Sequence, residues 1–381
     1  MCVPPIMLTA LSTSVAKLIN NPAAARYFRR MVVVFLIGMV AAAAVGVAGM
    51  VIARPGAGLS QQAQLLIGNM LRDAHTVGSS GATWAEVLFG LIPQNMFAAI
   101  AEGNYPQILF ISLLLGLLLG VVRLPATERM LELAELVFEL FQQAIMWSTY
   151  FLPVAVIGIV AGQVATAGVD LLLALGRLLA ACFVVAFFIW LVSSVLLAKA
   201  TGVSWREQER IMRRPLAFAF ATANSMATMP ILMETLEQLR LPRQLVNIVL
   251  PLGVLLARYA FVNYGAMALV FAMQLYGLPV TPGALAAIIA GSAFVGAATT
   301  GMPAVPFMTA LTIVSVPLGI PLEAVIPIFL AILPIFDPFG TAAAVQLQAA
   351  TTAIIVGQER EMALGAPGTG TRFPTQQVSS S

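Results

Sequence analysis

The chain has 381 residues, of which 60% are hydrophobic and 9% are charged, and its formal net charge is +3. A soluble domain carries about 25% charged residues, so this composition excludes an ordinary soluble protein and indicates an integral membrane protein. The apolar runs are continuous rather than alternating, which favours an all-α protein of several spanning helices over a β-barrel. The small net charge gives no indication of a nucleic-acid partner.

Metal-binding and nucleophilic side chains are scarce. The two cysteines, Cys2 and Cys182, predict neither a disulfide framework nor a thiolate metal site, and the single histidine, His75, lies in a polar segment. We therefore expect no resident metal, no cofactor and no enzyme activity.

The first half of the chain indicates helices separated by polar segments. In chain order we expect an apolar segment at residues 3–19, a basic turn, a span at 31–53, a polar loop at 54–83, a broken helix at 84–124 whose last part spans, and two long spans at 131–166 and 170–198. A basic cluster then closes this half, with Lys199, Arg206, Arg210, Arg213 and Arg214.

The second half has a different pattern. Residues 215–233 and 284–317 are apolar at both ends but small and polar in the middle, which is typical of re-entrant hairpins. A span follows each of them, at 245–276 and 322–356, and the tail from Gly357 is polar and predicts disorder. Opposed hairpins with broken spans are typical of an inverted-repeat transporter, whose site lies near the membrane midplane. An ion channel is the competing class, since selectivity filters also use re-entrant loops.

The positions of the arginines orient these segments in the membrane. The predicted order of spans places Arg54 and Arg72 outside the cell. The arginines on the cytoplasmic side are then Arg30, Arg123, Arg129, Arg206, Arg240, Arg243 and Arg360. This asymmetry is the one expected of a cell-membrane protein of bacterial inner-membrane type.

One carboxylate, Asp337, lies at membrane depth with long apolar runs on both sides. Such a charge is expensive and normally faces a cavity, a partner or a substrate path. Pro334, Pro338 and Gly340 predict a helix break beside it. The plainer interpretation is that Asp337 caps a helix that restarts at Pro338, and both interpretations can hold together.

Four motifs, in order and with nearly ungapped spacing, resemble the dicarboxylate/amino acid:cation symporter family, which includes the glutamate transporters. The motifs are the run 93–97 with 101–104, the run Phe220 to Pro230 that ends Thr-Met-Pro, Leu250-Pro251-Leu252-Gly253, and Gly301-Met302-Pro303. The resemblance covers nearly the whole chain up to Gly357.

The resemblance implies a homotrimer in which a rigid scaffold holds a mobile transport unit that moves like an elevator. It assigns residues 1–30 and 84–168 to the scaffold, residues 31–83 and 169–356 to the transport unit with hairpins at about 210–235 and 284–317, and 357–381 to a cytoplasmic tail. The family has eight spans, and this chain begins at what resembles the second, so we expect the first to be missing.

The resemblance also assigns functions to single positions. It places the substrate-amine aspartate at Asp337 and its threonine at Thr341, whereas the arginine that grips the substrate side-chain carboxylate falls on Gly340. The family's cation ligands fall on Ala257, Tyr259, Ala344 and Gln348, which removes most of the oxygens that sodium prefers. The coupling cation, sodium or proton, is therefore left open.

Arg258 lies in the middle of an apolar span and allows three interpretations. It binds a substrate carboxylate in bidentate fashion in place of the lost arginine, it pairs with Asp337 as a structural ion pair, or it snorkels to the membrane surface. Hairpin-tip hydrogen bonds to substrate are expected from Asn224, Ser225, Thr299, Thr300 and Gly301, whose alternative function is helix capping.

Together these observations predict a secondary active symporter of a small organic acid or amino acid, surrounded by membrane lipid. The alternative is a non-transporting sensor or decayed paralogue, which the loss of a span and of cation ligands would explain.

Overall fold

The computed structural model describes residues 3–20, 22–56, 92–102, 105–122, 124–149, 152–298, 307, 311–312, 314–322 and 325–365. Within these ranges the chain is helical and contains no strand. The helices are α1 (Val3–Asn20), α2 (Pro22–Ala53), α5 (Met96–Glu102), α6 (Tyr105–Val121), α7 (Pro125–Thr149), α8 (Leu152–Thr201), α9 (Trp205–Thr222), α10 (Ser225–Gln238), α11 (Arg243–Leu256), α12 (Tyr259–Leu275), α13 (Pro282–Ala298), the 3₁₀ turn η1 (Val316–Leu318) and α15 (Val325–Gly365).

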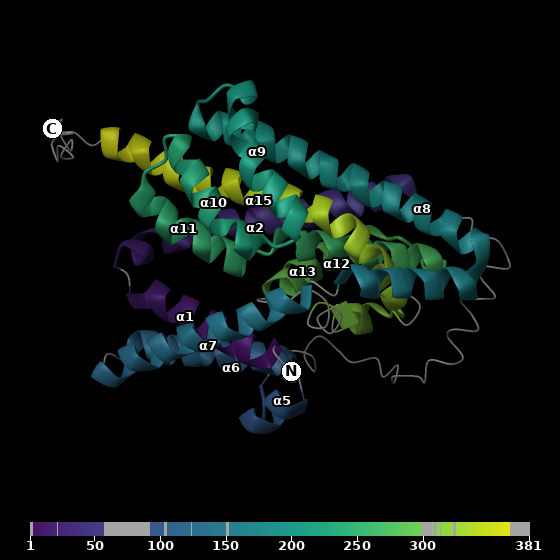
Figure 1. Cartoon of the computed structure of the whole chain (residues 1–381), viewed down its shortest axis with the longest axis horizontal. Helices are drawn as coiled ribbons and strands as arrows, with labels where there is room; N and C mark the ends of the chain where they lie inside the picture. Colours follow the sequence, from purple (N-terminus) through teal and green to yellow (C-terminus); the bar gives the residue numbers. More distant parts are fainter. Residues whose placement is uncertain are drawn as a thin grey trace.

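The described helices pack as two groups (Figure 1). In the smaller group α1 packs against α6 and α7, and α5 packs against α6. In the larger group α15 lies against α8, α9, α11 and α12, while α2 packs against α8, α12 and α13. Helix α1 therefore packs mainly with α6 and α7, and its contacts with α2 and α11 are smaller.

Among the described residues, four segments are long and apolar enough to cross a membrane by length and composition: Arg29–Ala53, Leu175–Thr201, Leu245–Leu275 and Ile335–Gly357. Each corresponds to a span expected from the sequence. The two spans expected at 131–166 and 170–198 have other boundaries in the structure. Helix α8 begins at Leu152 and continues through residue 168, where the sequence predicted a gap. No proline near residue 168 would end a helix there, whereas Pro153 fits the first turn of a helix that begins at Leu152.

The helix break expected beside Asp337 is wrong. Helix α15 runs through Pro334, Asp337 and Pro338 without interruption. Membrane helices tolerate proline when neighbouring helices cover the freed backbone groups, and α15 packs against α8, α9 and α12. Asp337 is thus inside a helix, which also excludes the interpretation that it caps a helix restarting at Pro338.

Two helix ends also differ from expectation. Helix α2 begins at Pro22, so Arg29 and Arg30 belong to its early turns rather than to a basic turn. Helix α15 continues to Gly365, beyond the predicted start of disorder at Gly357. Its last residues, Gln358 to Leu364, are mostly good helix formers, which explains the extension.

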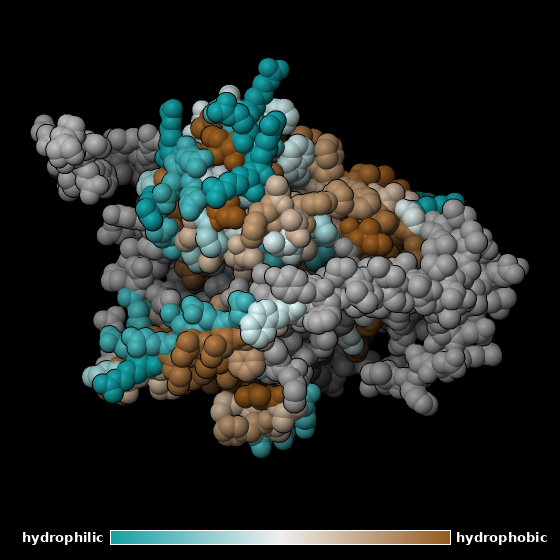
Figure 2. Space-filling view, in the orientation of Figure 1, coloured by the Kyte–Doolittle hydropathy of each residue, from teal (hydrophilic) through white to brown (hydrophobic). Residues whose placement is uncertain are grey.

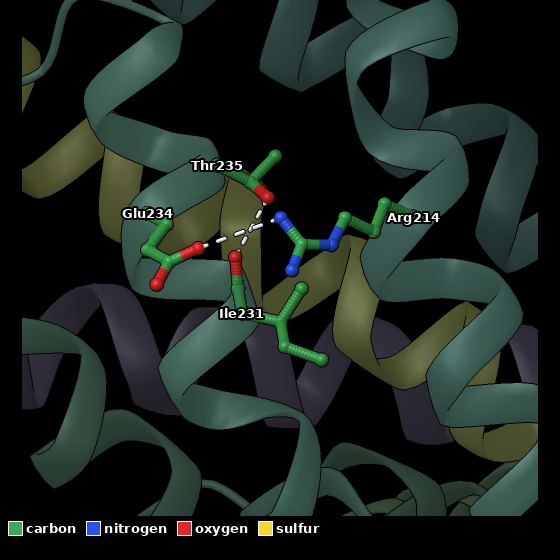
Figure 3. Close-up of polar contacts among 4 residues, drawn as sticks. All are labelled: Arg214, Ile231, Glu234 and Thr235. Carbon is green, nitrogen blue, oxygen red and sulfur yellow. Dashed lines mark hydrogen bonds and ion pairs between the residues drawn. The ribbon is translucent and has the colours of Figure 1, made fainter.

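Helices α9 and α10 form a packed pair centred on the first predicted hairpin. Ala223 takes a left-handed conformation, with φ of 47°, and Asn224 begins α10 by accepting hydrogen bonds from the N–H groups of Met226 and Ala227 at 2.9 and 3.1 Å. Arg214 and Glu234 join the two helices by an ion pair of 3.6 Å (Figure 3). Both side chains of this pair are exposed, so it contributes little to stability.

Candidate functional site

The predicted site residue Asp337 is half-buried on α15 and is held through one oxygen. Its Oδ1 accepts hydrogen bonds from the Tyr264 hydroxyl at 2.8 Å and from Thr341 Oγ1 at 3.0 Å. Thr341 lies one turn further along α15, which is the spacing that brings two helical side chains together. Oδ2 receives no hydrogen bond from the described residues, so half of this carboxylate is available to a ligand.

Tyr264 on α12 fixes the direction of that carboxylate. Its ring is 1% exposed and packs edge-on against Phe336 and Phe261, with centroids 4.7 and 5.8 Å apart. Its hydroxyl lies so close to Gly340 that any Cβ at that position would overlap it. Gly340 is therefore required by this tyrosine, and no larger side chain fits at 340 while Tyr264 keeps its place.

Arg258 lies at a break between α11 and α12. Ala257 and Arg258 have ψ angles of 76° and 69°, which are outside the helical range. The break frees backbone groups at membrane depth, an arrangement found where the backbone lines a cavity. The break predicted from the sequence was beside Asp337, so the interruption at Arg258 is a finding of the structure.

The Arg258 guanidinium is half-buried, and its carbon lies 4.8 Å from the centre of the Phe261 ring. Asp337 exerts an electrostatic attraction on it. No direct ion pair joins the two, and within the described part of the chain no acceptor receives a hydrogen bond from this guanidinium. The five N–H donors of the side chain remain available for a planar anion.

The described arms of both predicted hairpins approach this site. Phe220, near the end of α9, packs edge-on against Phe339 at 4.8 Å. A Cβ on Gly296 of α13 would lie 3.4 Å from the Arg258 carbonyl oxygen, so the two backbones nearly touch. Helix α9 thus contacts α15 two residues from Asp337, and α13 lies against the backbone of Arg258.

The structure describes two of the predicted tip residues, Asn224 and Ser225. The Asn224 side-chain oxygen caps α10, and Ser225 is half-buried in the first turn of that helix. Three further predicted site residues, Thr299, Thr300 and Gly301, lie outside the described residues.

Neutral groups occupy the positions that the resemblance assigns to cation ligands. The Tyr259 hydroxyl donates to Thr351 Oγ1 at 3.2 Å, and Thr351 in turn donates to the Leu347 carbonyl at 3.0 Å. The Gln348 amide packs directly on Gly253, and Ala344 offers no ligand. These contacts leave no carboxylate at the positions 257, 259, 344 and 348.

Sequence reasoning missed Tyr264. A signal was present, because a tyrosine hydroxyl buried in an apolar span needs a polar partner, and Asp337 is one of only two carboxylates in the sequence between Arg243 and Gly357. The sequence alone does not give the register of α12 against α15, which brings Tyr264 and Asp337 together.

Comparison with known proteins identifies the family of this chain. The model of the sodium:dicarboxylate symporter family matches residues 1–358. The chain is 28% identical to the proton/glutamate-aspartate symporter of Escherichia coli K12 over 330 residues, which cover 85% of this chain and 74% of that protein. It is 24% identical to the C4-dicarboxylate transport protein of Bacillus subtilis 168 and to the proton/sodium-glutamate symport protein of Geobacillus stearothermophilus, with 85% of this chain and 76% of each relative covered.

The helical architecture and the apolar spans define a multi-pass membrane protein of the secondary-transporter class. The family match, which extends over nearly the whole chain, is more specific: this protein belongs to the sodium:dicarboxylate symporter family.

Removing the Tyr264 hydroxyl tests the geometry of the site. Tyr264→Phe keeps the ring packing but removes one donor to Asp337, and a hydrogen bond to a charged group contributes about 1.5–3 kcal/mol. We expect a protein that folds, with substrate affinity reduced by about tenfold or more because the carboxylate loses its orientation. Titration calorimetry on the purified protein measures this.

The matched control is Tyr259→Phe, which removes a second buried hydroxyl from the same helix but one bonded to Thr351 rather than Asp337. Equal losses of substrate affinity in the two variants would contradict a specific function of Tyr264.

Proposed function

We propose that this protein is a cation-coupled symporter that carries a small acidic amino acid across the membrane, with a C4-dicarboxylate as the second candidate substrate. One observation carries the proposal. Among the residues that the structure describes, one oxygen of the Asp337 carboxylate receives no hydrogen bond and the Arg258 guanidinium has no acceptor, and the two groups lie near each other beside a helix break. Two opposite charges with unused hydrogen-bonding capacity are suited to a ligand that carries both charges.

The chemistry of the two groups assigns their functions. Oδ2 of Asp337 binds the substrate ammonium, while Oδ1 stays with Tyr264 and Thr341. Arg258 binds a substrate carboxylate in bidentate fashion, supported by the Phe261 ring beneath it. A dicarboxylate without an amine would leave Asp337 unmatched, which is why the amino acid is preferred.

The position of Gly340 supports an altered carboxylate site. The family's substrate-gripping arginine would fall at 340, where the Tyr264 hydroxyl leaves no room for a side chain. Arg258 comes to the same site from α12 and restores the lost positive charge. A non-transporting sensor is not favoured, because a purely structural function would be better served by a direct Arg258–Asp337 ion pair, which these two residues do not form.

The wider architecture follows the family pattern. The group of α1, α5, α6 and α7 is the scaffold, and the group of α2, α8 to α13 and α15 is the transport unit, which moves like an elevator within a homotrimer. The described helices pack mostly within each group and make fewer contacts between the groups, which supports this division. Residues 210–235 and 284–317 form opposed re-entrant hairpins whose tips meet over the substrate, Thr299, Thr300 and Gly301 included.

Opposed hairpins predict opposed accessibility. With single cysteines at Ser225 and Thr300 in an otherwise cysteine-free chain, a membrane-impermeant thiol reagent should label one from the cytoplasmic side and the other from outside. Mass spectrometry of vesicles of known orientation measures the labelling. Labelling of both positions from one side alone would contradict the inverted repeat.

The cation that drives transport is a proton rather than sodium. Sodium wants several oxygen ligands, preferably with a carboxylate among them, and the corresponding positions hold Ala257, Tyr259, Ala344 and Gln348. The hydrogen-bonded pair of Tyr259 and Thr351 occupies part of that space with neutral groups.

Uptake of labelled L-glutamate, L-aspartate and succinate into proteoliposomes tests the proposed function. We expect accumulation of an acidic amino acid driven by an inward proton gradient, with less than a twofold change when sodium is replaced by choline. Vesicles without protein, and vesicles with a protonophore added, serve as controls. A saturable and strict requirement for sodium would contradict the proton assignment, and no uptake of any of the three under either gradient would contradict the symporter.

A further inference from the structure

An open groove of about 470 Å³ lies where α8 meets α9, far along the chain from the substrate site. Its walls combine apolar side chains with one cation and one hydroxyl. The lining residues are Val195, Ala198, Lys199, Gly202, Val203, Ser204 and Trp205.

The apolar part of the groove continues along α8. Large exposed hydrophobic side chains follow this helix at spacings of three and four residues, which is the repeat of one helix face. They are Val184, Phe188, Val192 and Val195, and Lys199 comes next on the same face. Lys199 lies in the last turn of α8 and in the last turn of the span Leu175–Thr201, so an apolar track leads from the membrane interior to a cation at its surface.

The polar end of the groove is held in place by a buried network. The Trp205 indole N–H donates to Ser194 Oγ at 2.7 Å, and Ser194 also contacts Gln208 and Glu209. The indole ring remains 45% exposed beside the groove. A tryptophan fixed at the end of a span is typical of the membrane–water interface.

Basic side chains outnumber acidic ones around the groove, although Glu207 and Glu209 also lie on this part of α9. Arg206 and Arg213 are exposed on α9, and no ion pair to either is found among the residues that the structure describes. Figure 2 shows hydrophilic side chains gathered over α9, with hydrophobic surface beside them along α8. Ser204 makes no capping hydrogen bond to α9, so its hydroxyl is available to a ligand in the groove.

The geometry points to a binding site for one anionic glycerophospholipid in the α8–α9 groove. The headgroup phosphate binds Lys199 and Ser204, and one acyl chain follows the apolar track from Val195 to Val184. A soluble anion would bind Lys199 but would make no contact with the apolar side chains of α8. A neutral lipid would contact those side chains but would gain nothing from the charge of Lys199. The site is independent of Asp337 and Arg258 and holds the corner from which α9 leads to the first hairpin.

Lipid titration of the purified full chain tests this site. The delipidated protein in mild detergent is titrated with dioleoyl phosphatidylglycerol or with dioleoyl phosphatidylcholine, and native mass spectrometry measures the bound lipid. We expect one tightly held phosphatidylglycerol per protomer and at least fivefold weaker binding of phosphatidylcholine. A single basic side chain near an anionic surface contributes about 1 kcal/mol, which is about fivefold in affinity, so Lys199→Gln should weaken phosphatidylglycerol by that factor.

The matched control is Arg129→Gln, which removes an equally exposed cation from α7 in the other helix group. It should leave the affinity unchanged, and Lys199→Glu should lower it further than Lys199→Gln. Equal affinity for the two lipids, or unchanged affinity in Lys199→Gln, would overturn the proposal. Displacement of bound phosphatidylglycerol by millimolar inorganic phosphate would also overturn it, because the groove would then bind free phosphate rather than a lipid.

Discussion

The hydrogen bond from Tyr264 to Asp337 is the constraint on which the rest of the site depends. A carboxylate at membrane depth is costly unless its oxygens are bonded, and Tyr264 and Thr341 together supply Oδ1 with two donors. The bond requires α12 and α15 to pack closely, and Gly340 permits that approach because it has no side chain. Position 340 is then closed to an arginine, so in the proposed function the positive charge comes from another helix.

That charge comes from the broken helix. Between Arg243 and Gly357 the sequence has three charged residues, Arg258, Glu323 and Asp337. Arg258 is at the junction of α11 and α12, where the backbone leaves the helical conformation and Gly296 of α13 approaches it. The uninterrupted α15 and the interrupted α11–α12 thus present one carboxylate and one guanidinium to the same region from two directions.

Periodicity and apolar length were sufficient to predict the helical class and four spanning segments, since these follow from local composition. The rule that proline breaks a helix gave a wrong prediction at Asp337, which has two prolines beside it. Helix α15 stays intact there because its packing on neighbouring helices outweighs the propensity of single residues. The function of Tyr264 was not predictable either. It depends on the register of two helices that are distant in sequence, and a residue pattern within one helix does not encode that register.

The central claim is that Asp337 and Arg258 bind opposite ends of one substrate. The substrate affinities of two charge variants test it most directly. The measurement is calorimetric titration of Asp337→Asn and Arg258→Gln with L-glutamate and with succinate. The account predicts that Asp337→Asn loses tenfold or more in affinity for the amino acid and little for the dicarboxylate, because a charged hydrogen bond contributes about 1.5–3 kcal/mol. Arg258→Gln should weaken both ligands. Equal losses for both ligands in Asp337→Asn, or unchanged affinities in Arg258→Gln, would contradict the account.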